Sequence, residues 1–208
     1  MKIIIRSDHV HIEGYVNAVE RLSKPITERL GTFRERIMAG AFKKALARAE
    51  DVRILENHDM DRDLGGIKDG NLKLEEDSIG LRASTDIYDA RAIEDAKAGN
   101  LVGWSFGFYP LESKDTSENG MPIKEVYDME LVEVSLLNRE HIPAYDGTLV
   151  AVRDNETKMV VGESMMAEDI EIREDEPAKE TQEKEPETKE VSSEYFTGYR
   201  NMIAEMKA

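Results

Sequence analysis

The sequence contains no cysteine, and this absence removes several kinds of chemistry at once. Without thiols, the chain forms neither disulfides nor thiolate metal sites, and it offers no cysteine nucleophile. A long hydrophobic run is also missing at the N-terminus, where only the isoleucines 3–5 stand together before Arg6. That run is far shorter than the core of a signal peptide or a membrane span. We therefore expect a protein that is not exported and has no membrane partner.

Basic residues are scarce relative to acidic ones, 28 against 44, which gives the 208 residues a formal net charge of -16. An acidic surface repels phosphate, so nucleic acid is not expected as a partner. Residues 154–190 alone hold 14 acidic and 5 basic side chains, a contribution of 5 - 14 = -9. The composition thus predicts a folded domain over 1–153, followed by a tail of different character.

The tail is rich in glutamate, lysine, threonine and proline, and its hydrophobic residues are too sparse to offset the entropy lost on folding. We therefore expect residues 154–190 to form a disordered acidic linker. Residues 191–208 regain tyrosine, phenylalanine, methionine and isoleucine at helical spacing, which predicts a candidate short amphipathic helix.

Two stretches carry the spacing of amphipathic helices. The first covers 35–50, with alanines four residues apart, and the second covers 86–101, beginning at an acidic cap near Asp86. Residues 52–85 are predicted to form β-hairpins, and residues 113–122 a polar loop. Residues 123–137 are predicted to form a long strand, and residues 146–152 a final strand. The chain is therefore predicted to be an α+β protein, mainly antiparallel β with two or three helices.

Ser105 lies in the sequence GWSFG, which spells the G-x-S-x-G pattern of a nucleophile elbow. That elbow requires a strand, a sharp turn and a helix, followed by an acid and a histidine. Residues 106–110 instead alternate aromatic residues with glycine and end in proline, which suits a strand. We therefore interpret Ser105 as a serine on a strand. Its partner histidine has to be identified by geometry, since a triad is not defined by sequence order.

Four histidines are available. His9 and His11 point the same way from a predicted strand, but no third metal ligand is evident nearby, so surface residues are the simpler interpretation. His58 and His141 lie in predicted polar turns.

The alternating Asp59, Asp61 and Asp63 suggest a calcium loop, but the pattern fails. An EF-hand loop that starts at Asp59 needs glycine at Leu64 and glutamate at Gly70. We therefore expect no metal site here, only an acidic loop beside His58 that favours the protonated imidazole.

Several fragments occur in a characteristic order between about residues 10 and 152: ERIMAGAFKKAL, ILENHD with LGG shortly after, GLRASTDI, AKAGNLVGWSFGF, ELVEVSLL and PAYDGTLVAV. In order and spacing they resemble the prohead proteases of tailed bacteriophages, which mature capsids and share an architecture with herpesvirus assemblins. The resemblance implies a small, closed or nearly closed antiparallel β-barrel surrounded by a few helices. It also implies that His58 and Ser105 are catalytic.

The third catalytic residue is left open by the sequence. Strand alternation puts Glu133 on the face opposite Val134 and Leu136, which favours Glu133 as the residue that orients the histidine. Glu130 has the parity of the core residues, and a bulge would be needed to turn it, so it is the alternate. His141 is a third candidate, by analogy with the His-Ser-His arrangement of assemblins.

Further roles are predicted around Ser105. By analogy with an arginine-bearing loop of assemblins, Arg139 is the candidate for oxyanion stabilisation. Gly103 and Gly107 remove side chains beside Ser105 and would let an extended peptide approach, although relief of crowding in a bending strand explains them equally well.

The resemblance implies a serine endopeptidase without a cofactor, acting inside the assembling prohead in the host cytoplasm. Its expected substrates are scaffold and major capsid protein extensions, and its own tail beyond Arg153. A homodimer is the candidate oligomer by analogy with assemblins. Two other classes stay open: a non-catalytic assembly protein with the same barrel, and a hydrolase of small esters, which would need a deep apolar pocket near Ser105.

Overall fold

The computed structural model describes residues 1–28, 31–139, 159–161, 165–166 and 170–174. The chain divides into two compact units, Met1–Pro177 and Ala178–Ala208, and all described residues belong to the first. The strands in chain order are β1 (Lys2–Ile5), β2 (Val10–Ala18), β3 (Ile26–Glu28), β4 (Gly31–Ile37), β5 (Arg53–Glu56), β6 (Asp59–Gly66), β7 (Leu72–Glu76), β8 (Gly80–Ile87), β9 (Leu101–Glu118), β10 (Met121–Asn138), β11 (Val160–Val161), β12 (Met165–Met166) and β13 (Glu171–Glu174). The helices are α1 (Ala41–Arg48) and α2 (Ala90–Lys97). The prediction of a mainly β protein is confirmed.

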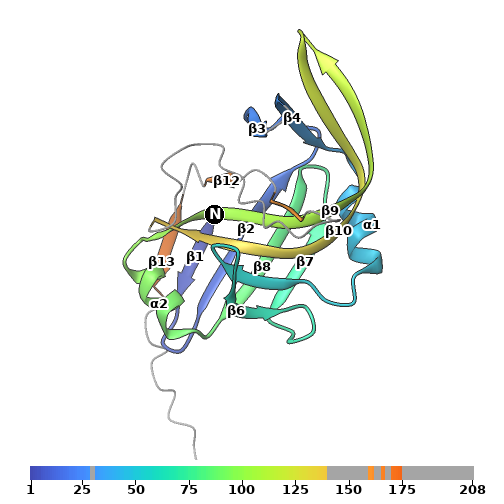
Figure 1. Ribbon diagram of the computed structural model, residues 1–208. Helices are drawn as coiled ribbons and strands as arrows, with labels where there is room; N and C mark the ends of the chain where they lie inside the picture. The colour runs from blue at the N-terminus through green and yellow to red at the C-terminus, as the bar shows by residue number, and fades with distance from the viewer. Residues whose placement is uncertain (29–30, 140–158, 162–164, 167–169, 175–208) are drawn as a thin grey trace, which may run out of the picture. The chain divides into compact units, whose positions relative to one another are not determined.

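The strands form two sheets (Figure 1). The five-stranded sheet has the order β13-β1-β2-β8-β7, and the eight-stranded sheet follows the path β11-β9-β10-β4-β3, with β12 on β9, β5 on β10 and β6 on β5. Apolar side chains of both sheets and of the helices form one core. Within it, Phe42 of α1 packs edge-on against Phe106 of β9, with ring centroids 5.3 Å apart.

The prediction of a closed barrel is wrong, because neither sheet closes on itself among the described strands. The reason lies in the long strand β10. Its first half pairs with β4 in parallel, through Ile123–Val126, and its second half pairs with β5 in parallel, through Glu133–Leu136. Two different strands thus branch from one edge of β10, so the sheet forks where a barrel would have to continue round.

Both helices are shorter than predicted. Residues 35–37 belong to β4, because they pair with β10, and α1 begins only after Gly40, whose φ of 88° interrupts the extended backbone. Helix α2 is capped by Asp89, whose side chain accepts a hydrogen bond from the Ala92 N–H, and not near Asp86. Neither helix in the described part of the chain is long and apolar enough to cross a membrane.

The stretch 113–122, predicted as a polar loop, is instead the end of a long hairpin. Strands β9 and β10 pair up to Glu118 and Met121, and Asn119 and Gly120 form the turn with φ values of 52° and 77°. Figure 1 shows the tip of this hairpin extending beyond the two sheets. Its side chains are polar because the strands there leave the core.

Three short strands lie beyond the predicted domain end at Arg153, so the expectation of a structureless linker does not hold for them. Strand β13 pairs with β1 in parallel, and β11 and β12 pair with β9. The predicted strand 146–152 and the candidate helix 191–208 lie outside the described residues.

Candidate active site

One face of the β9–β10 pair collects the polar groups predicted for catalysis. In the antiparallel register Ser105 stands opposite Ser135, and Gly107 stands opposite Glu133. Directly opposed residues share one face of a sheet, as do residues two apart in one strand. Ser105 and Ser135 are 0% exposed and Glu133 is 1% exposed. This face is therefore a buried polar patch next to the hydrophobic core.

His58 reaches this patch from a tight turn. Strands β5 and β6 pair through Glu56 and Asp59, which leaves Asn57 and His58 as the two turn residues. Their φ values are 55° and 62°, as a primed two-residue turn requires. Positive φ is uncommon outside glycine and is concentrated at functional sites. Since β5 runs beside β10, this turn lies next to Leu136 and the polar patch.

The Nδ1 atom of His58 lies 2.8 Å from Oε1 of Glu133. An ionised carboxylate can only accept a hydrogen bond, so this contact requires the proton on Nδ1. The Nε2 atom then carries the lone pair of the neutral ring. Nε2 is buried and has no hydrogen-bond partner among the described residues. The imidazole is thus held in the tautomer that accepts a proton on the side away from Glu133.

Ser135 connects the carboxylate and the histidine turn. Its hydroxyl donates to Oε2 of Glu133 over 2.5 Å and accepts from the backbone N–H of His58 over 3.1 Å. Glu133 is therefore bound through both oxygens, one to the ring of His58 and one to Ser135. A carboxylate fixed at both oxygens holds the imidazole in one orientation.

Gly107 provides the space for this carboxylate. A Cβ atom at Gly107 would lie 2.5 Å from Oε1 of Glu133 and 3.2 Å from the sulfur of Met159. The sequence predicted that Gly107 makes room for a substrate peptide. In the structure, the space left by its missing side chain holds the Glu133 carboxylate.

A second layer fixes the two ends of the histidine turn. Glu56 is 3% exposed, and its carboxylate accepts from Nδ2 of Asn138 over 2.6 Å and from Nε of Arg62 over 2.7 Å. Asn57 donates its N–H to the Leu136 carbonyl and accepts the Asn138 N–H on its side chain, over 2.8 and 3.0 Å. The residues just before His58 are therefore attached to β10.

Charges continue this layer towards α2. Arg62 binds the cap residue Asp89 over 2.8 Å as well as Glu56. The carboxylates of Asp89 and Glu56 raise the pKa of Arg62, and the Arg62 guanidinium lowers the pKa of Asp89. Arg62 therefore stays a cation that joins the histidine hairpin to the start of α2.

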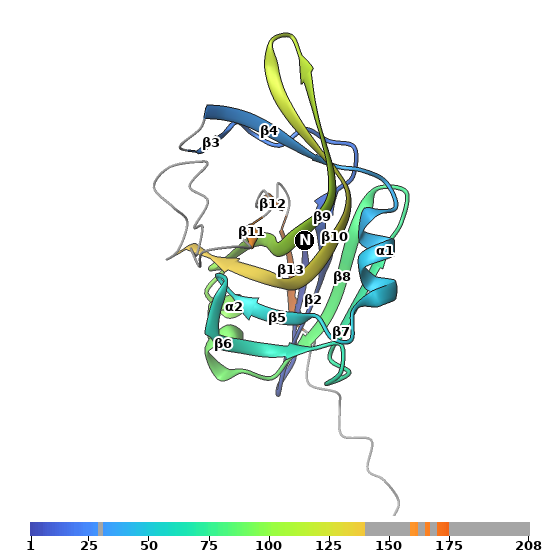
Figure 2. The same ribbon diagram turned by 45° about the vertical axis from the view of Figure 1, so that its right-hand side comes forward.

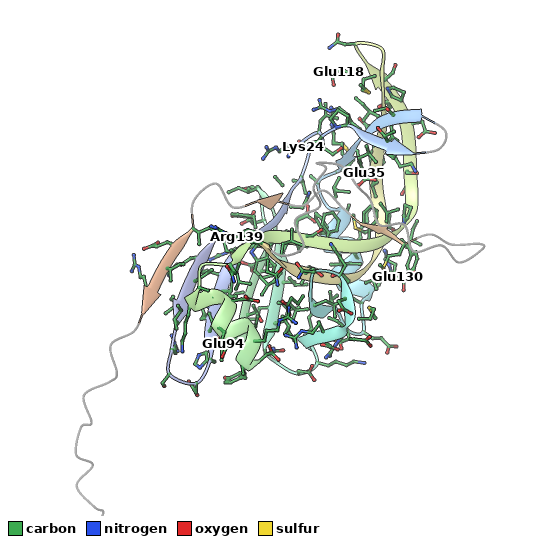
Figure 3. The ribbon with its side chains drawn as sticks, turned by 60° about the vertical axis from the view of Figure 1, so that its left-hand side comes forward. Lys24, Glu35, Glu94, Glu118, Glu130 and Arg139 are labelled. Carbon is green, nitrogen blue, oxygen red and sulfur yellow. The ribbon has the colours of Figure 1, made fainter. Side chains whose placement is uncertain are left out.

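The other predicted residues make none of the contacts described above, although Gly103, two residues before Ser105, shares its face of β9. Glu130 is exposed and Arg139 is exposed at the end of β10, and Figure 3 shows these two side chains well apart along the strand. The backbone N–H of Arg139 donates to the Asn100 carbonyl over 3.0 Å. Gly103 is buried on β9, opposite Leu137. His141 lies outside the described residues.

The N-terminal histidines form a separate cluster. His11 contacts Asp86 over 2.7 Å, and His9 lies 2.8 Å from Asp8 and 3.8 Å from Asp86. Within the described part of the chain, no group of three or more histidine, aspartate or glutamate side chains is arranged to hold a metal ion.

Sequence reasoning missed Ser135, Asn57, Asn138 and Glu56. Ser135 carried a usable signal, since it shares the strand parity of Glu133. The turn at Asn57 was also readable, because asparagine favours positive φ. The pairing of Glu56 with Asn138 depends on β5 lying beside β10, which no local pattern indicates.

Residues 2–162 match the family described as caudovirus prohead serine protease. Comparison with curated proteins and with solved structures found no match. The match covers most of the compact unit and includes the whole polar patch with its histidine turn. The chain therefore belongs to the prohead serine proteases of tailed bacteriophages.

Proposed function

We propose that Ser105, His58 and Glu133 form the catalytic triad of a serine endopeptidase. The observation that carries this proposal is the 2.8 Å contact between His58 Nδ1 and Glu133 Oε1, because Glu133 lies on the sheet face that also holds Ser105. Membership of the prohead protease family supports a serine peptidase of capsid maturation. Assigning the reaction to these three side chains is our step beyond that membership.

In the proposed reaction, the Ser105 hydroxyl oxygen attacks the carbonyl carbon of the scissile peptide while His58 Nε2 takes its proton. The resulting tetrahedral oxyanion collapses, the C–N bond breaks, and the proton passes from Nε2 to the leaving amine. Water then attacks the acyl-serine ester by the same route, which releases the acid and restores the hydroxyl. Glu133 stays ionised throughout and stabilises the imidazolium.

Two serines face each other in this patch, and we assign them different roles. Ser135 already binds both Glu133 and the His58 backbone, which suits a positioning residue. Ser105 stands across from it on β9, and we propose it as the nucleophile because it lies in the SFGF stretch that the family resemblance marks as catalytic. By analogy with the arginine-bearing loop of assemblins, Arg139, which follows β10, is the proposed source of oxyanion stabilisation.

The proposed substrates are the extensions of the major capsid protein, the scaffold, and the protease's own chain beyond Arg153, all cut inside the prohead in the host cytoplasm. The test incubates the wild-type protein and the Ser105→Ala variant with the capsid protein encoded by the same phage. Intact-mass analysis of both chains should reveal defined new termini only with the wild-type protein. Capsid maturation that proceeds unchanged with Ser105→Ala would instead support a non-catalytic assembly protein.

Self-trimming is tested separately in the same spectra. A shortened wild-type chain beside an intact Ser105→Ala chain is expected. A wild-type chain that stays intact while the capsid protein is cut would contradict self-trimming and leave the triad proposal standing.

A further inference from the structure

Strand β9 carries Ser105 between two edges, and both edges are occupied. One edge pairs with β10 along its whole length. The other edge pairs with β11 and β12, both antiparallel to β9. Figure 2 shows these two short strands beside β9. Their register is informative: Val161 stands opposite Gly107, and Met165 stands opposite Trp104. The chain's own later residues therefore pair with β9 on either side of Ser105.

An open strand edge beside a nucleophile is a natural binding place for a peptide. An extended peptide can add to a sheet edge as one more strand, and main-chain hydrogen bonds then supply the affinity. Such a strand passes the nucleophile with its carbonyl groups at a regular spacing. An antiparallel strand on this edge of β9 follows the path that β11 and β12 now take.

We propose that this edge of β9, from Gly103 to Phe108, is the docking strand for the substrate peptide, and that β11 and β12 occupy it in cis. This inference rests on the proposed function, since it assumes that Ser105 is the nucleophile. An extended polypeptide, and not a compact small molecule, is the ligand that the edge accepts. A substrate binds only after β11 and β12 have left the edge.

The segment that β11 and β12 form on this edge, called the cis segment here, pairs with β9 through short strands. It contributes only two residue pairs in β11 and two in β12. Of its described side chains, Val160 is partly buried against the core, and the Met159 sulfur lies near Gly107. Ser105 is nevertheless 0% exposed with the segment in place. Strands that pair through two residues each, on the edge of the strand that holds a buried nucleophile, fit an edge that opens for substrate.

The expected effect of releasing the segment follows from the population of the open state. The minor conformation of a two-state protein is populated at about 0.1–10%. The apparent reactivity of a site is reduced by that fraction. Releasing β11 and β12 should therefore raise the rate at which Ser105 reacts with an external reagent by about tenfold or more.

The test measures the labelling rate of the full chain with a fluorophosphonate–rhodamine probe, which forms a covalent adduct with activated serines. The variant Val160→Pro/Val161→Pro removes both backbone N–H donors of β11. Backbone N–H groups of successive strand residues point to opposite sides, so one of these two donors points at β9. The matched control, Thr181→Pro/Gln182→Pro, places the same change in the other compact unit. A second variant, Val160→Asp, weakens docking through a buried charge and keeps the backbone donors.

We expect both β11 variants to label about tenfold faster or more, and the control to label like the wild type. A synthetic peptide with the sequence of residues 157–168 should slow the labelling of the β11 variants. Equal labelling rates in folded wild-type and β11 variants would overturn the inference while the nucleophile stands. No Ser105-dependent labelling in any of these proteins would overturn the proposed function itself, and the inference with it.

Discussion

Replacing Gly107 by alanine tests whether the space beside Glu133 matters for catalysis. The φ of Gly107 lies outside the left-handed region, so the backbone accepts alanine and the effect comes from the new contact alone. The added Cβ would lie 2.5 Å from Glu133 Oε1, whereas ordinary contact begins at 3.4 Å, so the oxygen has to retreat by about 0.9 Å. Added to the 2.8 Å distance from His58 Nδ1, this retreat gives up to about 3.7 Å, which is no longer a hydrogen bond.

The expected loss of activity is large and the loss of stability is moderate. Removing the orienting carboxylate of a serine-protease triad lowers kcat by roughly 10⁴-fold, so we expect a decrease of about 10²- to 10⁴-fold for Gly107→Ala. Overpacking of this kind costs about 1–3 kcal/mol, which a domain of ordinary stability survives.

A double-mutant cycle gives the decisive comparison. Fluorophosphonate labelling rates are measured for the wild type, Gly107→Ala, Glu133→Ala and the double variant, with thermal unfolding as the control for folding. If alanine acts by displacing Glu133, it should cost little in the Glu133→Ala background. An equal loss in both backgrounds, or no loss in the wild-type background, would refute this reasoning.

Three further predictions follow from the same contacts. Ser135→Ala removes one hydrogen bond to an ionised carboxylate, which is worth about 1.5–3 kcal/mol. Fluorophosphonate labelling should therefore slow by about 10- to 100-fold, with the adduct still on Ser105. An adduct abolished altogether would make Ser135 the nucleophile. Asp89→Ala removes the α2 cap and should lower the free energy of unfolding in urea by about 1 kcal/mol at pH 7. Because Arg62 lowers the pKa of Asp89, the stability that Asp89 contributes is complete above its unfolded pKa near 3.8. This stability is lost as the pH falls through the lower pKa of Asp89 in the folded state. A difference in unfolding free energy between wild type and Asp89→Ala that persists below that pH would contradict the prediction. Glu130→Gln changes an exposed side chain and should label like the wild type, and a strong decrease would revive the alternate assignment.

The parts of the site that follow strand alternation were predictable. Glu133 and not Glu130 was favoured because its parity opposed that of Val134 and Leu136, and Glu133 is the carboxylate that contacts His58. The catalytic roles of both stay predictions. Glu133 is 1% exposed although its strand parity is opposite to that of the core residues, because both faces of β10 are covered there. Alternation alone did not indicate this.

The errors arose where one pattern serves two structures. Residues 35–37 fit the helix that follows them, yet pairing with β10 makes them a strand, so tertiary contact overrides helix propensity. Residues 113–122 lack hydrophobic alternation because the hairpin tip leaves the core, and alternation is the main local sign of a half-buried strand. Strands β11 and β12, two residues each, are too short for any periodicity to reveal.

The barrel prediction came from the family resemblance and not from the residues. Whether a sheet closes depends on which strands share the edges of β10, and that is decided by contacts distant in sequence. The sequence predicted the class of fold and singled out several of the polar residues that lie together in the polar patch. The branching of β4 and β5 from one edge, and with it the position of the histidine turn, required the structure.

The most direct test of the account is to locate the fluorophosphonate adduct by peptide mapping of the labelled wild-type protein. The triad proposal predicts a single adduct on Ser105, formed at least about 10²-fold more slowly when His58 is replaced by alanine, because a positioned general base contributes about 10²- to 10⁴-fold. An adduct on another serine, or labelling of Ser105 that does not depend on His58, would contradict it.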